Sequence, residues 1–482
     1  MNVFGRQVVT GAVWAAVETW GRQIAMFGVF VVLARHLGPE AFGLAALAMV
    51  VPNILAAPVT RGLPDAIIQR AEIDPIHLDS AFYLLAATGA AISGLIWISA
   101  GAVAAAFDQP HLEALVKWTS AIVVIQAFAV VPAAILKRQL DFRLFAVRTL
   151  TGSAVGGALG VGMAIAGFGV WSLVWMQLTK AAVETTVILF GSSWRPRLRF
   201  SYVRIRELFG FAGPLVLQTL WNFGNDEIPK IVLGAFLGPH AVGIYALARR
   251  PLDLLVESLL WPLMAITMPT VSRIQGQPEK INDFFNATVR MAGIIGFPAF
   301  VGFAAVAPVA VPFIFGQQWS VGVAAVQILM ILGVQRTVDS LCSFTILALG
   351  RSGILLKLNM IYTVLALVLI TGGVQINFEW AVAALVVSNV VLLPFFLFQV
   401  QRIARIDVVR PLVIFPRLAV ASALMFAVVS VWLRGAPASA APGIVLAGGI
   451  LIGAAVYAAA SFVLVRPDLL NARNFVLRLR AR

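Results

Sequence analysis

The sequence predicts an all-α integral membrane protein of about fourteen transmembrane helices, arranged as two six-helix lobes related by an internal repeat plus two C-terminal helices. Three observations support this prediction: the composition, a duplicated segment and the sidedness of the basic residues. Hydrophobic residues make up 61% of the 482 residues and charged residues 12%, whereas soluble domains average about 45–50% and about 25%. A chain this apolar is expected to lie in a lipid bilayer.

Fourteen apolar runs have about the 20 residues that a helix needs to cross the hydrocarbon layer. They lie near 10–34, 41–62, 81–105, 112–136, 145–167, 170–190, 208–234, 240–264, 288–313, 321–348, 353–374, 378–399, 418–433 and 444–465. The last two runs contain no ionisable residue, so we expect them to be peripheral to the rest of the bundle.

A twelve-residue phrase occurs twice, as LGPEAFGLAALA at Leu37–Ala48 and as LGPHAVGIYALA at Leu237–Ala248, and eight of its positions are identical. The copies are 200 residues apart, and each falls between the first and second apolar runs of its half. We therefore predict a lobe in residues 1–200, a second in 201–400, and two extra helices with a basic tail in 401–482. Because each lobe has an even number of spans, the repeat should be parallel, with a central site between lobes.

The net charge of +14 could indicate a nucleic-acid partner, but the positions of the basic residues argue against one. Loops on one side of the predicted membrane hold 26 of the 35 Lys and Arg residues, among them Arg61, Lys137 and Arg148. The alternate loops hold Arg35, Lys117 and Arg434. The positive-inside rule makes the basic side cytoplasmic and places both termini there. The excess charge is then a topology signal, and anionic lipid headgroups are its nearest partner.

The densest basic run, Trp194–Arg206 (WRPRLRFSYVRIR), lies where the two lobes should join. One interpretation is a connector lying along the lipid headgroups and anchored by Trp194, Phe200 and Tyr202. The other is a solvated loop that merely follows the positive-inside rule. The sequence favours neither.

Glycines at 152, 156 and 160 recur at every fourth position of the fifth span. They share one face of a helix and allow a neighbouring backbone to approach closely. We interpret them as packing residues without a chemical role.

Six cations fall inside predicted spans, and each has an acid at helical spacing. At about 2.5–3.5 kcal/mol per charge at the membrane centre, they must face protein or water rather than lipid. Pairs three or four residues apart can neutralise one another on one helix face. These pairs are Glu18 with Arg22, Lys180 with Glu184, Asp226 and Glu227 with Lys230, Arg249 and Arg250 with Asp253, and Arg336 with Asp339.

The seventh span is the most polar. Within about two turns it carries Asn222, Asn225, Asp226, Glu227 and Lys230, together with Gly224 and Pro229. A proline removes one backbone donor and frees carbonyl groups of the preceding turn. Broken polar helices near the bilayer midplane are where transporters place their binding sites.

Several functional classes are disfavoured. Cys342 is the only cysteine, so the chain forms no internal disulfide. The histidines fall in or beside predicted loops, which supports neither a metal site nor a proton relay within the membrane. A phosphate-binding loop with Lys-Ser/Thr is missing, which argues against ATP hydrolysis. A polymerase or ligase of surface glycans would need a sizeable outer loop, and all outer loops are short. We expect no enzymatic activity, although a passive scaffold in an export complex is not excluded.

An ordered set of motifs covers about residues 8–400. It comprises LARHLGPEAFGLAAL, GLPDAIIQR at Gly62–Arg70, LKRQLDFR at Leu136–Arg143, GFGVWSLV at Gly167–Val174, WRPRLRF, LGPHAVGIYALARR, FGQQW at Phe315–Trp319 and LALGR at Leu347–Arg351. With these motifs the chain resembles Wzx-like polysaccharide transporters of the multidrug/oligosaccharidyl-lipid/polysaccharide exporter superfamily. The resemblance implies two lobes enclosing a cavity, alternating access, and movement of undecaprenyl-pyrophosphate-linked oligosaccharide from the cytoplasmic to the periplasmic leaflet of a bacterial inner membrane. The glycan would serve the synthesis of exopolysaccharide, capsule or lipopolysaccharide, and a glycan polymerase and export machinery would be partners.

The resemblance supplies no set of site residues, so we assign them from charge. A pyrophosphate needs cations, and Arg can contact it with two donors at once. The predicted cationic lining is Arg22, Lys230, Arg249, Arg250 and Arg336, while Asn222 and Asn225 would bond sugar hydroxyls. Glu18, Asp226, Glu227 and Asp339 would balance these cations and exchange a coupling proton or sodium ion. No other cofactor and no metal is expected.

Two alternatives share the same superfamily. A cation-coupled multidrug exporter would need a mainly acidic and aromatic cavity for organic cations, and the surplus of cations disfavours it. A flippase for lipid-linked peptidoglycan precursors also has extra terminal spans and an anionic cargo, and it remains open.

Overall fold

The computed structural model describes residues 21–70, 72–139, 141–437 and 439–464, and every regular element in these ranges is a helix. Glu18 lies outside these residues, and so do the side chains of Asn222 and Asn225 within their helix. The chain divides into two compact units, Met1–Gly243 and Ile244–Arg482. The lobe boundary expected near residue 200 describes the sequence repeat and stays a prediction.

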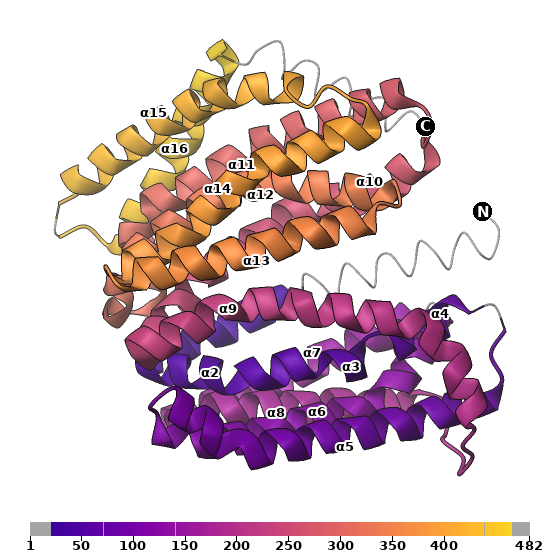
Figure 1. The fold of residues 1–482 in the computed structure, drawn as a ribbon. Helices are drawn as coiled ribbons and strands as arrows, with labels where there is room; N and C mark the ends of the chain where they lie inside the picture. Colours follow the sequence, from indigo (N-terminus) through magenta and orange to yellow (C-terminus); the bar gives the residue numbers. More distant parts are fainter. Residues whose placement is uncertain (1–20, 71, 140, 438, 465–482) are drawn as a thin grey trace. The chain divides into compact units, whose positions relative to one another are not determined.

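The described part of the first unit begins with a helix over residues 21–36. It continues with α2 (Pro39–Leu55), α3 (Ala57–Thr60), α4 (Leu63–Gln69), α5 (Pro75–Ala106), α6 (Pro110–Arg138), α7 (Phe142–Ile165), α8 (Trp171–Gly191) and the first part of α9 (Tyr202–Leu255). Helix α6 packs on both α5 and α8, and α7 packs on α8. Figure 1 shows these four helices running side by side.

The second unit holds the end of α9, a π-helical turn (Val256–Leu260), α10 (Trp261–Arg273), α11 (Pro278–Phe315), a 3-10 turn (Gln317–Gly322) and α12 (Val323–Ala348). It is completed by α13 (Ser352–Val374), α14 (Phe378–Ala404), a 3-10 turn (Arg410–Val413), α15 (Ile414–Gly435) and α16 (Pro442–Leu464). The two last helices pack on each other and on α11. Leu418 and Met425 of α15 and Tyr457 of α16 share a buried apolar cluster with Phe297 of α11, and their peripheral position stays a prediction.

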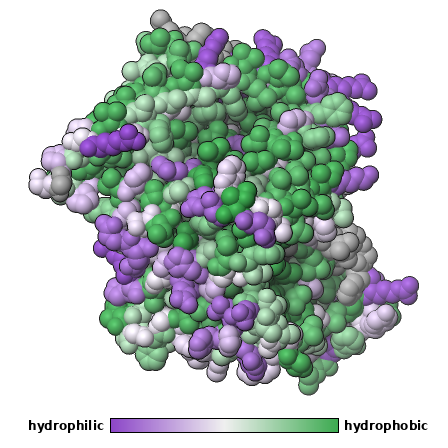
Figure 2. Space-filling model, turned by 60° about the vertical axis from the view of Figure 1, so that its left-hand side comes forward, coloured by the Kyte–Doolittle hydropathy of each residue, from purple (hydrophilic) through white to green (hydrophobic). Residues whose placement is uncertain are grey.

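The described residues contain eleven helices that are long and apolar enough to cross a membrane, or twelve if the bent pair Pro39–Leu55 and Ala57–Gln69 is one span. Helix α9 covers two of the expected runs, 208–234 and 240–264. It consists of two helices that join at a break at Gly238, where φ is 77°. Large apolar side chains such as Ile98 and Phe190 lie on the surface, and Figure 2 shows hydrophobic residues over much of the visible face. The chain is thus a multi-pass membrane protein, and the count of fourteen spans stays a prediction.

The second span is bent by 51° between α2 and α3–α4. Pro52 lies inside α2, Pro58 is the second residue of α3 and Pro64 the second residue of α4. Proline supplies no backbone donor, and Gly62 before α4 has φ 83°, a conformation that glycine adopts readily. The broken span therefore places half-buried Thr60 and Asp65 and exposed Arg61 along the lining of a cavity in the first unit.

Candidate functional site

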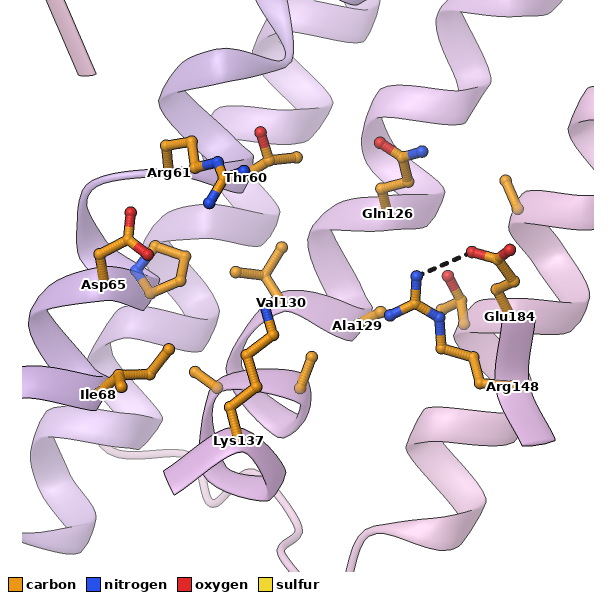
Figure 3. Close-up of a pocket in the computed structure, with 15 residues that line it drawn as sticks. Thr60, Arg61, Asp65, Ile68, Gln126, Ala129, Val130, Lys137, Arg148 and Glu184 are labelled. Carbon is orange, nitrogen blue, oxygen red and sulfur yellow. Dashed lines mark hydrogen bonds and ion pairs between the residues drawn. The ribbon is translucent and has the colours of Figure 1, made fainter. Parts of the chain in front are cut away.

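A cavity of about 310 Å³ lies within the first unit, beside the break in the second span. Its lining comes from α3 and α4, from α6, and from α7 and α8. Figure 3 shows Thr60, Arg61 and Asp65 on one side and Arg148 with Glu184 on the other, with residues of α6 between them. Apolar side chains of α6, among them Val130, complete the walls. Binding sites for small groups have volumes of about 300–1,000 Å³.

The lining carries a net positive charge, because Arg61, Lys137 and Arg148 face only two carboxylates. Arg148 Nη2 donates to Glu184 Oε2 at 3.0 Å, and both side chains are largely buried. The second carboxylate, Asp65, accepts from the backbone N–H of Gly62 at 3.4 Å and so is engaged at the start of α4. Both carboxylates of the lining are thus engaged, which leaves Arg61 and Lys137 as the surplus cations of the cavity.

Close packing of α7 on α8 positions the Arg148–Glu184 pair. A Cβ at Gly152 would lie 2.4 Å from Glu184 Cγ, and a Cβ at Gly156 would lie 2.8 Å from the carbonyl oxygen of Met176. The packing role predicted for these glycines is confirmed. The buried ring of Phe145 lies 5.6 Å from Arg148 Cζ and 5.6 Å from Lys137 Nζ, which orients both cations through cation–π contact.

Sequence reasoning missed this cavity. It assigned Arg61, Lys137 and Arg148 to cytoplasmic loops, where cations only report topology. Arg148 instead lies within α7 and pairs with Glu184, which the sequence paired with Lys180 on the same helix. The position of Arg148 inside the apolar run 145–167 could have indicated a buried cation. Its partner Glu184 is 36 residues away, however, and helical spacing cannot predict such a pair.

A second polar cluster joins α9 to α2. Lys230 Nζ donates to Glu227 Oε2 at 2.7 Å, as the helical spacing predicted. The other carboxylate oxygen accepts from Asn53 Nδ2 at 3.0 Å, and Glu227 is only 4% exposed. The buried carboxylate of the seventh span is thus held by a cation on its own helix and an amide on the second span. Asn53 is one amide in a long apolar run, so sequence spacing alone gave it no partner.

An ion network holds the first turns of α9 against the loop before α5. Arg70 Nη2 donates to Glu207 Oε2 at 2.6 Å, and Arg204 Nη1 donates to Glu207 Oε1 at 3.2 Å. The backbone N–H of Asp74 donates to His77 Nδ1, and His77 Nε2 lies 3.2 Å from Glu207 Oε2. The His77 ring thus bridges the backbone of Asp74 and the carboxylate of Glu207. His77 is buried in the first turn of α5, and the sequence had placed it in or beside a loop.

In the second unit, Arg249 of α9 lies 3.4 Å from Asp253 Oδ2 and donates to the Tyr245 hydroxyl at 3.3 Å. The Arg249–Asp253 pair was predicted from the helical spacing. Arg336 and Asp339 lie one turn apart on α12 and are both half-buried. In the described structure they form no hydrogen bond or contact ion pair, but the Arg336 guanidinium still attracts the Asp339 carboxylate, as the helical spacing predicted.

The predicted lining residues are distributed over both units. Arg22, half-buried, and Lys230 belong to the first unit, and Arg249, Arg250 and Arg336, also half-buried, belong to the second. Of the predicted coupling acids, Glu227 is buried and Asp226 exposed. The assignment of these residues to substrate or ion binding stays a prediction.

Comparison with known proteins identifies the family. A family described as "Polysaccharide biosynthesis protein" matches residues 32–324, which is more than half of the chain. The chain belongs to this polysaccharide biosynthesis family. The predicted resemblance to Wzx-like polysaccharide transporters is therefore confirmed.

Individual relatives with related names also match the chain. The chain is 26% identical over 384 residues to lipopolysaccharide biosynthesis protein WzxC of Escherichia coli (strain K12), covering 77% of this chain and 75% of that protein. It is 23% identical over 397 residues to teichuronic acid biosynthesis protein TuaB of Bacillus subtilis (strain 168), covering 80% and 81%. It is 26% identical over 321 residues to succinoglycan biosynthesis transport protein ExoT of Rhizobium meliloti (strain 1021), covering 66% and 65%.

Solved structures share the fold. The inward closed lipid II flippase MurJ superposes with a TM-score of 0.77 at 16% identity, covering 94% of this chain and 99% of MurJ. An inward-facing multidrug resistance MATE transporter of the MOP superfamily gives 0.66 at 18% identity, covering 82% and 98%. At these identities the likeness is one of fold, and it confirms the predicted all-α membrane architecture.

Proposed function

We propose that this member of the polysaccharide biosynthesis family is a flippase. It moves undecaprenyl-pyrophosphate-linked oligosaccharide across the bacterial inner membrane for surface polysaccharide synthesis, without covalent catalysis. The names of its relatives link them to lipopolysaccharide, succinoglycan and teichuronic acid biosynthesis, and one is called a transport protein. The carrying observation is the cavity of the first unit, which has a net positive charge inside a multi-pass bundle.

The cavity suits the charged part of such a substrate better than its lipid or glycan. Arg61 and Lys137 supply donors for phosphate oxygens, and Arg148 is held in place by Glu184 and Phe145. An arginine can contact a phosphate through two parallel N–H groups, whereas lysine acts as a point charge. In this proposal the pyrophosphate contacts Arg61 and Lys137 first, and Arg148 exchanges Glu184 for a phosphate oxygen.

The remaining predicted residues complete the path. The same anion would be contacted in other states of the cycle by the predicted cationic lining, Arg22, Lys230, Arg249, Arg250 and Arg336. Sugar hydroxyls would form hydrogen bonds with Asn222 and Asn225. A ligand can favour one state only by binding it more tightly than the other. Contacts that form with different cations in different states would provide this difference.

We assign ion coupling first to Glu227. Its carboxylate is buried and bound by Lys230 and Asn53. Binding of a proton or sodium ion at Glu227 would weaken its attraction to Lys230 and free that cation for the substrate. Glu18, Asp226 and Asp339 are further candidates for the same exchange.

The proposed orientation places both termini and the basic run Trp194–Arg206 in the cytoplasm. Reporter fusions at Ser193 and at the C-terminus test it in intact cells. Periplasmic activity of either fusion would refute the orientation and the two-lobe interpretation with it.

The transport experiment uses the Arg148–Glu184 pair. Proteoliposomes containing a short-chain polyprenyl-pyrophosphate oligosaccharide with a fluorescent sugar are assayed for movement between leaflets. Arg148→Ala should lower transport by at least tenfold, the expected loss of one charge-assisted contact to phosphate. Arg351→Ala, at an exposed position on the turn before α13, is the control and should transport normally.

A structural role for the pair gives a different result. If Arg148 only neutralises Glu184, Arg148→Ala leaves a largely buried carboxylate unpaired and should lower the amount of folded protein. The double variant Arg148→Ala with Glu184→Ala should then recover both folded protein and transport. Full transport by the double variant would rule out substrate binding by Arg148.

The same assay separates the alternatives within the superfamily. Movement of a lipid-linked peptidoglycan precursor in preference to the lipid-linked oligosaccharide would favour a peptidoglycan-precursor flippase. Ion-driven export of organic cations would favour a multidrug exporter, a function that the net positive cavity disfavours.

A further inference from the structure

The linker between α8 and α9 presents a mixed apolar and basic surface that the transport proposal does not use. Four large apolar side chains are exposed there: Leu198 at 93%, Phe200 at 57%, Tyr202 at 72% and Val203 at 66%. Arg197 and Arg199 alternate with them and are exposed as well. We call these six residues the linker patch.

The backbone of this linker is fixed rather than loose. The N–H of Arg197 donates to Asp79 Oδ1 at 3.1 Å, and the N–H of Ser201 donates to Ser80 Oγ at 2.9 Å. Trp194 packs edge-on against Phe82, with ring centroids 5.7 Å apart. The predicted aromatic anchor Trp194 thus packs on the protein itself, while Phe200 and Tyr202 face outward.

The attachment point sets the depth of the patch along the membrane normal. Helix α5 has 32 residues, and at about 1.5 Å per residue it is about 48 Å long, whereas the hydrocarbon layer is about 30 Å thick. Asp79 and Ser80 precede its apolar run, which starts near residue 81. The linker is therefore attached to α5 just outside the hydrocarbon, at the level of the lipid headgroups.

We propose that the linker patch binds the anionic headgroup layer of the membrane in which the protein lies. The four apolar side chains of the patch insert at the boundary between headgroups and acyl chains, where aromatic side chains such as Phe200 and Tyr202 are favoured. Arg197 and Arg199 pair with anionic lipid phosphates, an attraction that falls off within a Debye length. Charge complementarity and depth both favour lipid over a soluble protein as the partner.

This contact couples lipid composition to the start of α9. The patch ends at Tyr202 and Val203, the first two residues of α9, which carries the Glu227–Lys230 pair farther along. A patch held on the membrane surface fixes this end of the helix. Its occupancy is a property of the folded protein in a bilayer and does not depend on which substrate is transported.

The test places a fluorescent label on the patch. Cys342 is the only cysteine and is buried, so the native protein should not react with a thiol label. Leu198→Cys puts the label in the patch, and Gln277→Cys, exposed on the turn before α11, is the control. Both are reconstituted in nanodiscs of phosphatidylcholine, with or without phosphatidylglycerol.

Two quenchers report the environment of the label. Nitroxide lipids labelled near the headgroup should quench the fluorescence of the label several-fold more at position 198 than at position 277. Iodide in solution should quench it several-fold less at position 198 than at position 277. Phosphatidylglycerol should increase the shielding, and salt or Arg197→Gln with Arg199→Gln should reduce it. Arg197→Gln keeps the backbone bond to Asp79, so loss of shielding would reflect charge.

Other results overturn the proposal. Equal access of iodide to positions 198 and 277 in both lipid mixtures would show that the patch is solvated or awaits a protein. Shielding that appears only at high protein density would assign it to a second copy of the chain. Equal shielding with and without phosphatidylglycerol would refute the preference for anionic lipid.

Discussion

Gly43 and Gly243 contact each other's helices reciprocally. A Cβ on Gly43 would lie 1.7 Å from the carbonyl oxygen of Pro239, and a Cβ on Gly243 would lie 1.8 Å from that of Pro39. Each glycine thus meets the proline that precedes the other, and the positions are 200 residues apart. The two copies of the repeated Leu-Gly-Pro segment therefore lie side by side, and the parallel relation of the two halves stays a prediction.

Alanine at either glycine should be strongly disruptive. A methyl group at Gly43 or Gly243 would overlap a backbone oxygen, which cannot move aside like a flexible side chain. Each substitution should therefore lower the free energy of unfolding by at least the roughly 1–3 kcal/mol that overpacking usually costs. We expect a lower melting temperature in detergent and loss of transport for both. Gly94→Ala, where a Cβ meets open space, is the control. Wild-type stability of Gly43→Ala would show that the two turns separate in the dominant state.

The Asn53–Glu227–Lys230 cluster should respond to the order in which its charges are removed. Lys230→Met alone leaves a buried carboxylate without its cation and should destabilise the protein by about 3–5 kcal/mol. Glu227→Gln with Lys230→Met removes both charges and should restore folded protein. If Glu227 couples transport to an ion, the double variant should no longer respond to a proton or sodium gradient. Gradient-driven transport at the wild-type rate by this variant would exclude Glu227 from coupling.

Glu207 should make stability depend on pH under acidic conditions. Hydrogen bonds from Arg70 and from His77, with the charge of Arg204, lower the pKa of Glu207 from 4.5 to about 2. A depressed pKa stabilises the fold above the unfolded value, and this contribution is lost as pH falls through the folded value. The melting temperature of wild type should therefore approach that of Glu207→Gln as pH falls from about 4.5 to about 2. A difference between them that is constant over this range would contradict the prediction.

Arg336 offers a test of the lining in the second unit. Its guanidinium attracts the Asp339 carboxylate without forming a contact ion pair, so Arg336→Ala should reduce the amount of folded protein only modestly. If Arg336 contacts the pyrophosphate, transport should fall about tenfold or more, and Arg336→Lys should recover part of it because the charge remains without the planar fork. Transport and membrane abundance are measured together. Normal transport by Arg336→Ala would remove this residue from the site.

The sequence alone determined the class of the protein. An apolar composition, long hydrophobic runs and ordered motifs are local properties, and they led to the multi-pass helical fold and the family. Helical spacing also predicted Glu227 with Lys230 and Arg249 with Asp253, because both partners lie within about one turn and the geometry of one helix fixes their separation.

Only the tertiary structure decided which distant residues meet. Arg148 with Glu184, Asn53 with Glu227 and His77 with Glu207 join different helices, and no sequence period encodes such contacts. The bend of the second span brought Arg61 into a cavity that charge counting had treated as a loop signal. On α12, the backbone places Arg336 and Asp339 one turn apart, but side-chain rotamers and neighbouring groups determine whether they touch. Local periodicity sets where a residue lies on its helix, whereas packing between helices sets what it contacts.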